Sequence, residues 1–231
     1  MPVNYAEIPA TMVVELAKRG DVIALIPVGS IEQHCSGPLG LDGFIAEIIA
    51  RESCRLLEER RIGECIILPT LFYGYSPEWS SIKGTISLDV ESYARIIEAI
   101  VGNLMDTGFK RIVVLNGHGG NSSIIEAVLR SIAREGYILA LVNYWDVAGL
   151  RLDHAGRIEE MVVKQLGLNY KLGDCIDRVE YIGKPRIIAG KASKPSKLEV
   201  GEEQLASNII ERVAEALEWI IKLELGERIL I

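Results

Sequence analysis

The sequence lacks the features of secreted, membrane-spanning and nucleic-acid-binding chains. Its four cysteines form no Cys-x-x-Cys pair, so they are expected to be reduced thiols in a cytoplasmic protein. No apolar run is long enough to cross a bilayer, and the first residues show no basic region followed by an apolar one. The net charge of -7 argues against a general nucleic-acid surface. We therefore expect a small-molecule partner, and neither a membrane nor a nucleic acid.

What the chain does contain is a regular alternation of apolar strands and amphipathic helices. Strands are expected at residues 22–28, 64–69, 111–115 and 138–142. Helices are expected at residues 10–18, 43–60, 90–105, 122–134, from beyond 153 to about 166, and 202–223. This order predicts an α/β fold with a mainly parallel sheet that helices cover on both faces. Without a repeat or a linker, residues 1–231 are expected to form one domain, with a surface loop at 184–198.

Candidate metal ligands follow the first of these strands. Glu32 and His34 are two residues apart, so in an extended segment their side chains point the same way. Asp42 comes next, where a helix begins, and Glu, His and Asp together suit a divalent metal such as Zn or Mn. Alternatively, Asp42 is only the N-cap of that helix and the other two are solvated loop residues. Cys35 could be a further ligand, although a small filler beside the site is the favoured interpretation.

A second strand end carries His118. This residue lies in Asn116-Gly-His-Gly-Gly-Asn121, directly after the strand at 111–115. Glycines on both sides of the histidine allow a sharp turn and a close approach of the backbone to a ligand. The structural alternative is a tight strand-to-helix turn that happens to contain a histidine.

A third candidate segment is Asp153-His-Ala-Gly-Arg-Ile-Glu-Glu160, which opens a helix. In the functional interpretation His154 carries a proton, and Glu159 is a metal ligand or general base. The structural alternative is that Glu159 and Glu160 only favour the amino end of a helix, where the helix dipole attracts negative charge.

The small number of histidines favours the functional interpretation. The chain has three, His34, His118 and His154, and each lies in a glycine-containing loop after a predicted strand. Histidines placed at random would also occur on helices. Because the carboxyl ends of parallel strands share one edge of a sheet, these three loops can converge on one metal site.

These motifs together resemble those of the creatininase (creatinine amidohydrolase) family. The resemblance covers nearly the whole chain, down to the Gly201-Glu-Glu pattern before the last expected helix. It implies a three-layer α/β/α sandwich, often assembled into a homo-oligomer such as a hexamer. The segments that carry it are Gly29-Ser-Ile-Glu-Gln-His34, Pro38-Leu-Gly-Leu-Asp42, Gly84-Thr-Ile-Ser-Leu88, Asn116-Gly-His-Gly-Gly-Asn121 and His154-Ala-Gly-x-x-Glu159.

The resemblance also implies a reaction and a set of site residues. Members of the family are dinuclear metal hydrolases of cyclic amides and related C–N bonds. By this resemblance Glu32, Asp42 and His118 bind one divalent ion, and His34 binds a second that Asp42 bridges. His154 matches the family's catalytic histidine. The expected cofactor is a divalent metal, two ions per chain, of Zn, Mn or Fe.

The chain departs from the family pattern near the expected substrate site. Creatininase itself has a glutamate that binds the second metal where this chain has Gly120, and Glu159 is the candidate replacement. Many relatives have Glu-His where this chain has Glu78-Trp79. These differences argue against assuming creatinine as the substrate. A small cyclic amide or formamide is expected, with two alternatives: a formylamino-pyrimidine nucleotide of riboflavin or deazaflavin biosynthesis, or a metal-binding relative without activity.

Overall fold

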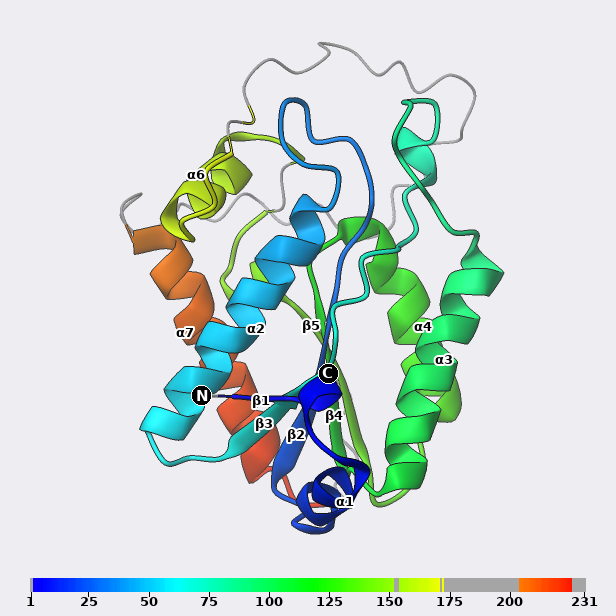
Figure 1. The fold of residues 1–231 in the computed structure, drawn as a ribbon, viewed down its shortest axis with the longest axis vertical. Coiled ribbons are helices and arrows are strands. Elements are labelled where there is room, and N and C mark those ends of the chain that lie inside the picture. The colour runs from blue at the N-terminus through cyan, green and yellow to red at the C-terminus, as the bar shows by residue number, and fades with distance from the viewer. Residues whose placement is uncertain (1, 152–153, 171, 173–203, 226–231) are drawn as a thin grey trace.

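The computed structural model describes residues 2–151, 154–170, 172 and 204–225, and these residues form a parallel sheet at the centre of the molecule (Figure 1). The strand order is β1-β3-β2-β4-β5, and every neighbouring pair is parallel. The strands are β1 (Val3–Asn4), β2 (Val22–Val28), β3 (Glu64–Ile67), β4 (Arg111–Asn116) and β5 (Ile138–Asn143). The predicted parallel α/β sheet is confirmed.

Helices cover both faces of this sheet, with α2, α6 and α7 on one side and α3 and α4 on the other (Figure 1). Each side has its own apolar core. The first side is formed by α2 (Leu41–Glu59), α5 (Tyr144–Val147), α6 (Arg157–Gln165) and α7 (Leu205–Lys222). The second side is formed by α1 (Ala10–Lys18), α3 (Val90–Thr107) and α4 (Ser122–Ile132). The result is the expected three-layer α/β/α sandwich.

The central strand β2 is apolar throughout because both of its faces are covered. All seven residues of β2 are buried. Ile23 and Leu25 pack into the core under α2 and α7, while Ala24 and Ile26 pack into the core under α3. This alternation follows from the two-residue period of a strand.

The helix and strand predictions are confirmed within a few residues among the described ranges. The boundary that matters most is that of α2, which begins at Leu41 rather than at residue 43. The short elements β1 and α5 were not expected, because two and four residues are too few to show a periodicity. Three short 3-10 turns were not expected either: η1 (Tyr5–Glu7), η2 (Pro77–Trp79) and η3 (Gly119–Asn121).

Some expectations fall outside the described residues. These are the surface loop at 184–198, the Gly201-Glu-Glu pattern and the start of the last helix at 202–203. The single domain over 1–231 includes them and stays a prediction. Among the described residues, no helix combines the length and the apolar character that a membrane crossing requires.

Among the cysteines that the structure describes, the prediction of reduced thiols is wrong at one position. Cys54 and Cys65 are free and buried, as expected, whereas Cys35 is disulfide-bonded. A disulfide depends on the approach of two residues in space, and spacing along the chain does not show it.

Candidate metal centre

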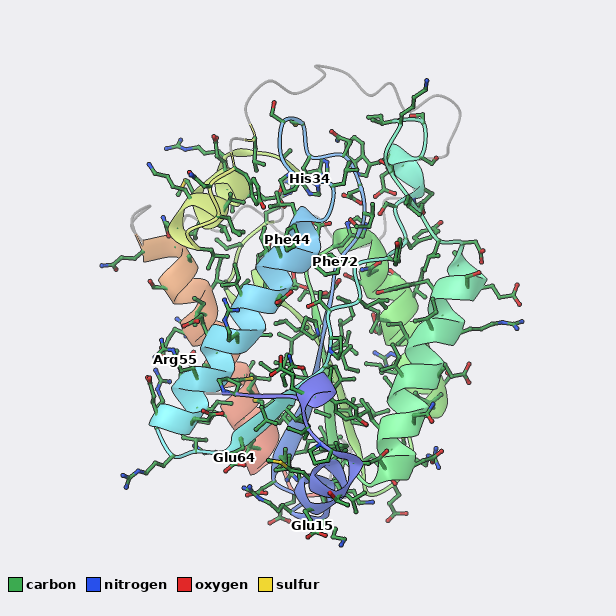
Figure 2. All side chains as sticks on the ribbon, in the orientation of Figure 1. Glu15, His34, Phe44, Arg55, Glu64 and Phe72 are labelled. Atoms are coloured by element: carbon green, nitrogen blue, oxygen red, sulfur yellow. The ribbon has the colours of Figure 1, made fainter. Side chains whose placement is uncertain are left out.

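The candidate site lies at the carboxyl edge of the sheet, where three strands end in register. Val28 of β2 pairs with Asn116 of β4, which pairs with Asn143 of β5. The side chain of Asn116 also donates a hydrogen bond to Asn143 Oδ1 at 3.0 Å. In Figure 2 the site residue His34 lies at the upper end of the sheet, opposite Glu64, where β3 begins. The loops that carry His34 and His118 therefore leave the same edge, and the segment that carries His154 follows β5 after the short helix α5.

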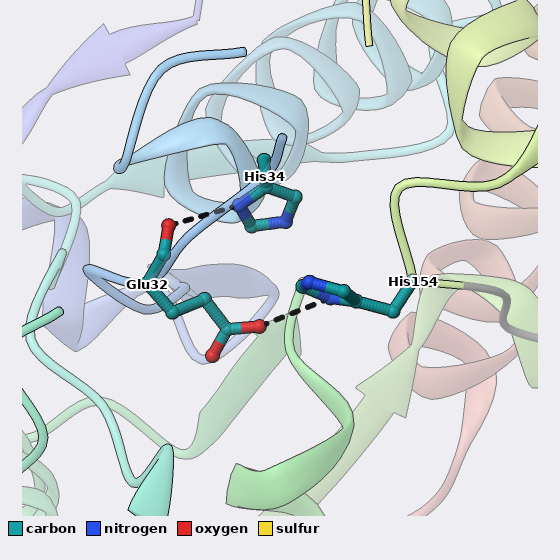
Figure 3. Close-up of side chains that lie close together, drawn as sticks. All are labelled: Glu32, His34 and His154. Carbon is teal, nitrogen blue, oxygen red and sulfur yellow. Dashed lines mark hydrogen bonds and ion pairs between the residues drawn. The ribbon is translucent and has the colours of Figure 1, made fainter. Parts of the chain in front are cut away.

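Glu32 is at the centre of the cluster. It is 0% exposed, and neither of its carboxylate oxygens has a hydrogen-bond partner. Oε1 lies 3.2 Å from His154 Nδ1, and Oε2 lies 3.3 Å from His118 Nδ1. Figure 3 shows the carboxylate pointing toward the ring of His154. A buried carboxylate without hydrogen bonds is costly unless a cation balances its charge.

Asp42 connects two of the histidines and does not act as a helix cap. The N-cap of α2 is Gly40, and Asp42 lies in the first helical turn. Its Oδ1 lies 3.0 Å from His34 Nε2, and its Oδ2 lies 3.2 Å from His118 Nδ1. Oδ2 also accepts a hydrogen bond from Ser30 Oγ at 2.7 Å. The N-cap alternative for Asp42 is therefore wrong, and its two oxygens face two different imidazoles.

Backbone carbonyls orient two of the imidazoles. His34 Nδ1 donates to the carbonyl oxygen of Glu32 at 3.1 Å (Figure 3), and His118 Nε2 donates to that of Tyr75 at 3.0 Å. Because a carbonyl only accepts, these contacts place a proton on the outer nitrogen of each ring. Once the other nitrogen loses its proton, its lone pair points toward the carboxylates, the arrangement found in histidines that bind metals.

Glu159 reaches the cluster from α6. It is 2% exposed, and its Oε1 lies 3.7 Å from His34 Nε2. Its Oε2 accepts a hydrogen bond from the backbone N–H of Ala155 at 2.6 Å. A carboxylate is thus present beside His34 although the chain has glycine at position 120.

Gly120 has no room for a side chain in this structure. A Cβ atom there would lie 2.3 Å from the carbonyl oxygen of Tyr75 and 2.5 Å from His118 Nε2. The hydrogen bond that orients His118 therefore occupies the space of a side chain at 120. A side chain at 120 would require Tyr75 or His118 to move.

His154 is held by Gln33 and Trp79. Its Nε2 lies 2.9 Å from both the side-chain nitrogen and the main-chain oxygen of Gln33. The amide orientation is fixed because Gln33 Oε1 accepts from the backbone N–H of Cys35 at 3.0 Å. On its face, the ring stacks on Trp79 with centroids 4.1 Å apart. The His154 side chain is 26% exposed, so unlike His34 it remains open to solvent on one side.

The electrostatics of the cluster favour bound cations. Burial alone would lower the pKa of His34, but the charge of Asp42 and hydrogen bonds to Asp42 and Glu159 raise it to about 11. For His118 burial acts the same way, and Asp42 and Glu32 raise its pKa to about 9. Burial raises the pKa of Glu159 above its usual range. Without metal, the imidazoles of His34 and His118 therefore hold protons, and bound metal ions can displace these protons.

The distances also fit metal ligation. At the ~2.1 Å bond lengths and tetrahedral angles of zinc sites, neighbouring ligand atoms lie about 3.4 Å apart. Among the described residues, three groups offer ligand atoms within 4.8 Å of one another. They are Glu32, His34 and His154; Glu32, Glu78 and His118; and His34, Asp42 and Glu159.

The structure brings together every residue predicted for the site, namely Glu32, His34, Asp42, His118, His154 and Glu159. Sequence reasoning missed the contributions of Gln33 and Glu78. Gln33 lies in a segment that carries the family resemblance, and Glu78 lies next to a position that departs from it, but neither position by itself shows which side chain it approaches. The backbone at Cys35 and Ala155 has positive φ values of 55° and 48°, and such conformations cluster at functional sites.

Gly117 determines how closely α2 approaches the end of β4. A Cβ atom there would lie 2.4 Å from the main-chain oxygen of Asp42, so the backbone carrying that ligand would have to move. We expect Gly117→Ala to lower the free energy of unfolding by about 1–3 kcal/mol, as overpacking does, and to weaken metal binding. Urea unfolding and metal titration measure both effects.

Gly102, inside α3, is the matched control because nothing lies within 4 Å of its Cβ position. Gly102→Ala is expected to stabilise the chain by up to about 1 kcal/mol. Equal stability changes in the two variants would contradict the role given to Gly117.

The fold and the cluster define an α/β protein with a buried group of carboxylates and imidazoles at the carboxyl edge of its sheet. The model of the family named Creatininase (creatinine amidohydrolase) matches residues 6–166. The chain belongs to this family, as its motifs had indicated.

Three characterised relatives show the range of the family. The creatinine amidohydrolase of Pseudomonas putida is 30% identical over 143 residues, which are 55% of this chain and 52% of that protein. A mycofactocin precursor peptide peptidase of Mycobacterium ulcerans is 31% identical over 65% of this chain and 60% of its own length. The 2-amino-5-formylamino-6-ribosylaminopyrimidin-4(3H)-one 5'-monophosphate deformylase of Methanococcus maripaludis is 30% identical over half of each chain. The matches thus span about half to three fifths of these relatives.

A solved structure supports the fold over nearly the whole chain. The structure described as "Creatininase Mn" superposes with a TM-score of 0.75 over 96% of this chain and all of that one, at 19% identity. At this identity the likeness concerns the fold. The predicted creatininase-like sandwich is confirmed.

Proposed function

We propose that this protein is a metal-dependent amidohydrolase that cleaves a C–N bond in a small cyclic amide or formamide. The observation that carries the proposal is Glu32, fully buried and without a hydrogen-bond partner, with two imidazole nitrogens within 3.3 Å. Family membership supports the reaction class.

The ligands would come from the loops that follow β2 and β4 and from the helices α2 and α6. Glu32, Asp42 and His118 would hold one divalent ion, and His34, Asp42 and Glu159 a second. Asp42 suits the shared position because its two oxygens face His34 and His118. Divalent ions bound here would activate a water molecule and polarise a carbonyl. Zn, Mn and Fe all accept this mixture of carboxylates and imidazoles.

His154 would carry the proton that the leaving nitrogen needs. Its Nε2 has a donor and an acceptor of Gln33 at 2.9 Å, so this nitrogen has a partner whether or not it holds a proton. Its partial exposure leaves one side of the ring open to a substrate. A histidine suits the task because its ordinary pKa is near neutrality.

Two further functions are alternatives within the same site. One is hydrolysis of the formyl group of a formylamino-pyrimidine nucleotide, favoured by the similarity to the Methanococcus maripaludis deformylase. The other is metal binding without catalysis, which the substitutions at Gly120 and Trp79 would allow.

Metal analysis combined with a substrate screen tests the proposal. The purified chain is expected to contain at least one divalent ion, and to release product from a cyclic amide or an N-formyl compound. Product from the formyl compounds alone would select the deformylase alternative. Bound metal without turnover on any compound would select the non-catalytic one, and a chain that binds no metal would refute all three.

We also propose that the protein is a cytoplasmic homo-oligomer, a hexamer by family resemblance. The free thiols of Cys54 and Cys65 fit a reducing compartment, whereas the disulfide at Cys35 does not. Sedimentation and cell fractionation measure the two properties directly.

Glu159→Gln is expected to lose the second metal ion preferentially. An amide is a poorer ligand than a carboxylate, while it can still accept the hydrogen bond from Ala155. Metal stoichiometry after dialysis is expected to fall from two ions toward one per chain. The exposed neighbour Glu160 gives the matched control, Glu160→Gln, which is expected to keep both ions. Two ions retained in Glu159→Gln would contradict this assignment.

A further inference from the structure

Glu78, in the turn η2, approaches the cluster but has no part in the proposed function. Its carboxylate belongs with Glu32 and His118 to a group whose ligand atoms all lie within 4.8 Å. Glu32 is 0% exposed and lacks hydrogen-bond partners, and His118 is 5% exposed. Two carboxylates this close repel each other in a buried setting unless a cation lies between them. The carboxylate of Glu32, which has no hydrogen-bond partner, is a second observation that points to a cation here, independently of Glu78.

The residues before and after Glu78 both contact residues of the candidate site, and these contacts hold the turn η2 in place. On the amino side, the backbone N–H of Tyr75 donates to Asn121 Oδ1 at 2.9 Å, and its carbonyl accepts from His118. On the carboxyl side, the ring of Trp79 stacks on that of His154. Glu78 lies between Tyr75 and Trp79, so these contacts hold its backbone close to Glu32.

We propose that Glu78 is an additional ligand of the metal ion held by Glu32 and His118. The proposal rests on the proposed function, because it adds a residue to the same ion. With Asp42 also facing His118 Nδ1, the ion would have three carboxylates and one imidazole around it. Sets dominated by carboxylate oxygens suit Mn²⁺, whereas zinc sites are more often built from imidazoles and thiolates. Glu78 would therefore favour Mn²⁺ over Zn²⁺.

The test is metal titration of the full chain after chelation, with Mn²⁺ and Zn²⁺ in separate experiments. Glu78→Gln keeps the shape of the side chain and removes the charge. We expect it to bind Mn²⁺ at least about 10-fold more weakly than the unaltered chain, with a smaller change for Zn²⁺. The matched control is Glu91→Gln, at an exposed glutamate of α3, which is expected to change neither affinity.

Thermal unfolding separates a ligand from a structural residue. Without metal, Glu78→Gln is expected to unfold at the same or a higher temperature, because it removes a repelling charge. The rise in unfolding temperature on adding Mn²⁺ is expected to be smaller than in the unaltered chain. An unaltered Mn²⁺ affinity, or a lower metal-free unfolding temperature with a full rise on adding Mn²⁺, would overturn the proposal. If the unaltered chain binds neither ion, the proposed function itself fails, so the two failures are distinct.

Discussion

Replacing His154 with alanine is expected to lower hydrolysis by about 10²–10⁴-fold while the chain keeps its metal ions. The leaving nitrogen of an amide needs a proton. The imidazole is placed to supply it, with Gln33 at Nε2 and Trp79 against its face. The measurement is the rate on any substrate found in the screen, with metal content determined on the same sample. The loss is expected in kcat, since the ring acts on the reaction more than on binding.

His154→Gln is the useful companion variant. It keeps a polar side chain of similar size but cannot carry a proton near neutral pH, so it is expected to lose activity to the same extent. Activity within a few-fold of the unaltered chain in both variants would refute the proton-carrier role. Loss of metal together with activity would make His154 a ligand instead, since it also forms a group with Glu32 and His34.

Replacing His118 with alanine is expected to have the opposite pattern and to empty the metal site. Its Nδ1 lies within 3.3 Å of both Glu32 and Asp42, so its removal takes away the only imidazole proposed for that ion. We expect metal affinity to fall by about 100-fold or more. Replacing a residue that only hydrogen-bonds to a metal ligand already lowers affinity by about 10–100-fold. Metal analysis after dialysis, with circular dichroism to verify folding, measures the effect.

The two histidine variants control for each other. Both remove an imidazole from the same cluster, but only His118→Ala is expected to release metal. A folded His118→Ala chain with unchanged metal stoichiometry would refute the ligand set proposed for the first ion.

Local spacing was enough to find most of the candidate site. The apolar segment at 22–28 shows the strand, and Glu32 and His34 follow it on one side of an extended chain. His118 follows β4 in the same way. Parallel strands end at a common edge, so the convergence of these loops could be inferred before any contact was known.

Other features depend on residues that are far apart in the sequence. Gln33 and His154 are separated by 121 positions, and their contact has no local signal. The same holds for Glu78 beside Glu32 and for the disulfide at Cys35. Helix boundaries are also set partly by packing, which is why Asp42 lies inside α2 and faces two histidines instead of capping the helix.

The sequence by itself determined the order of the longer strands and helices, the parallel sheet and the residue types of a metal site. It could do so because periodicity and spacing act over a few residues and appear directly in the chain. The tertiary structure decided which side chains meet. It filled the space at Gly120 with a hydrogen bond of His118, brought Glu159 of α6 to His34 in the loop after β2, and left Glu32 buried without a hydrogen-bond partner. These outcomes depend on the packing of segments far apart in the chain, which no local pattern specifies.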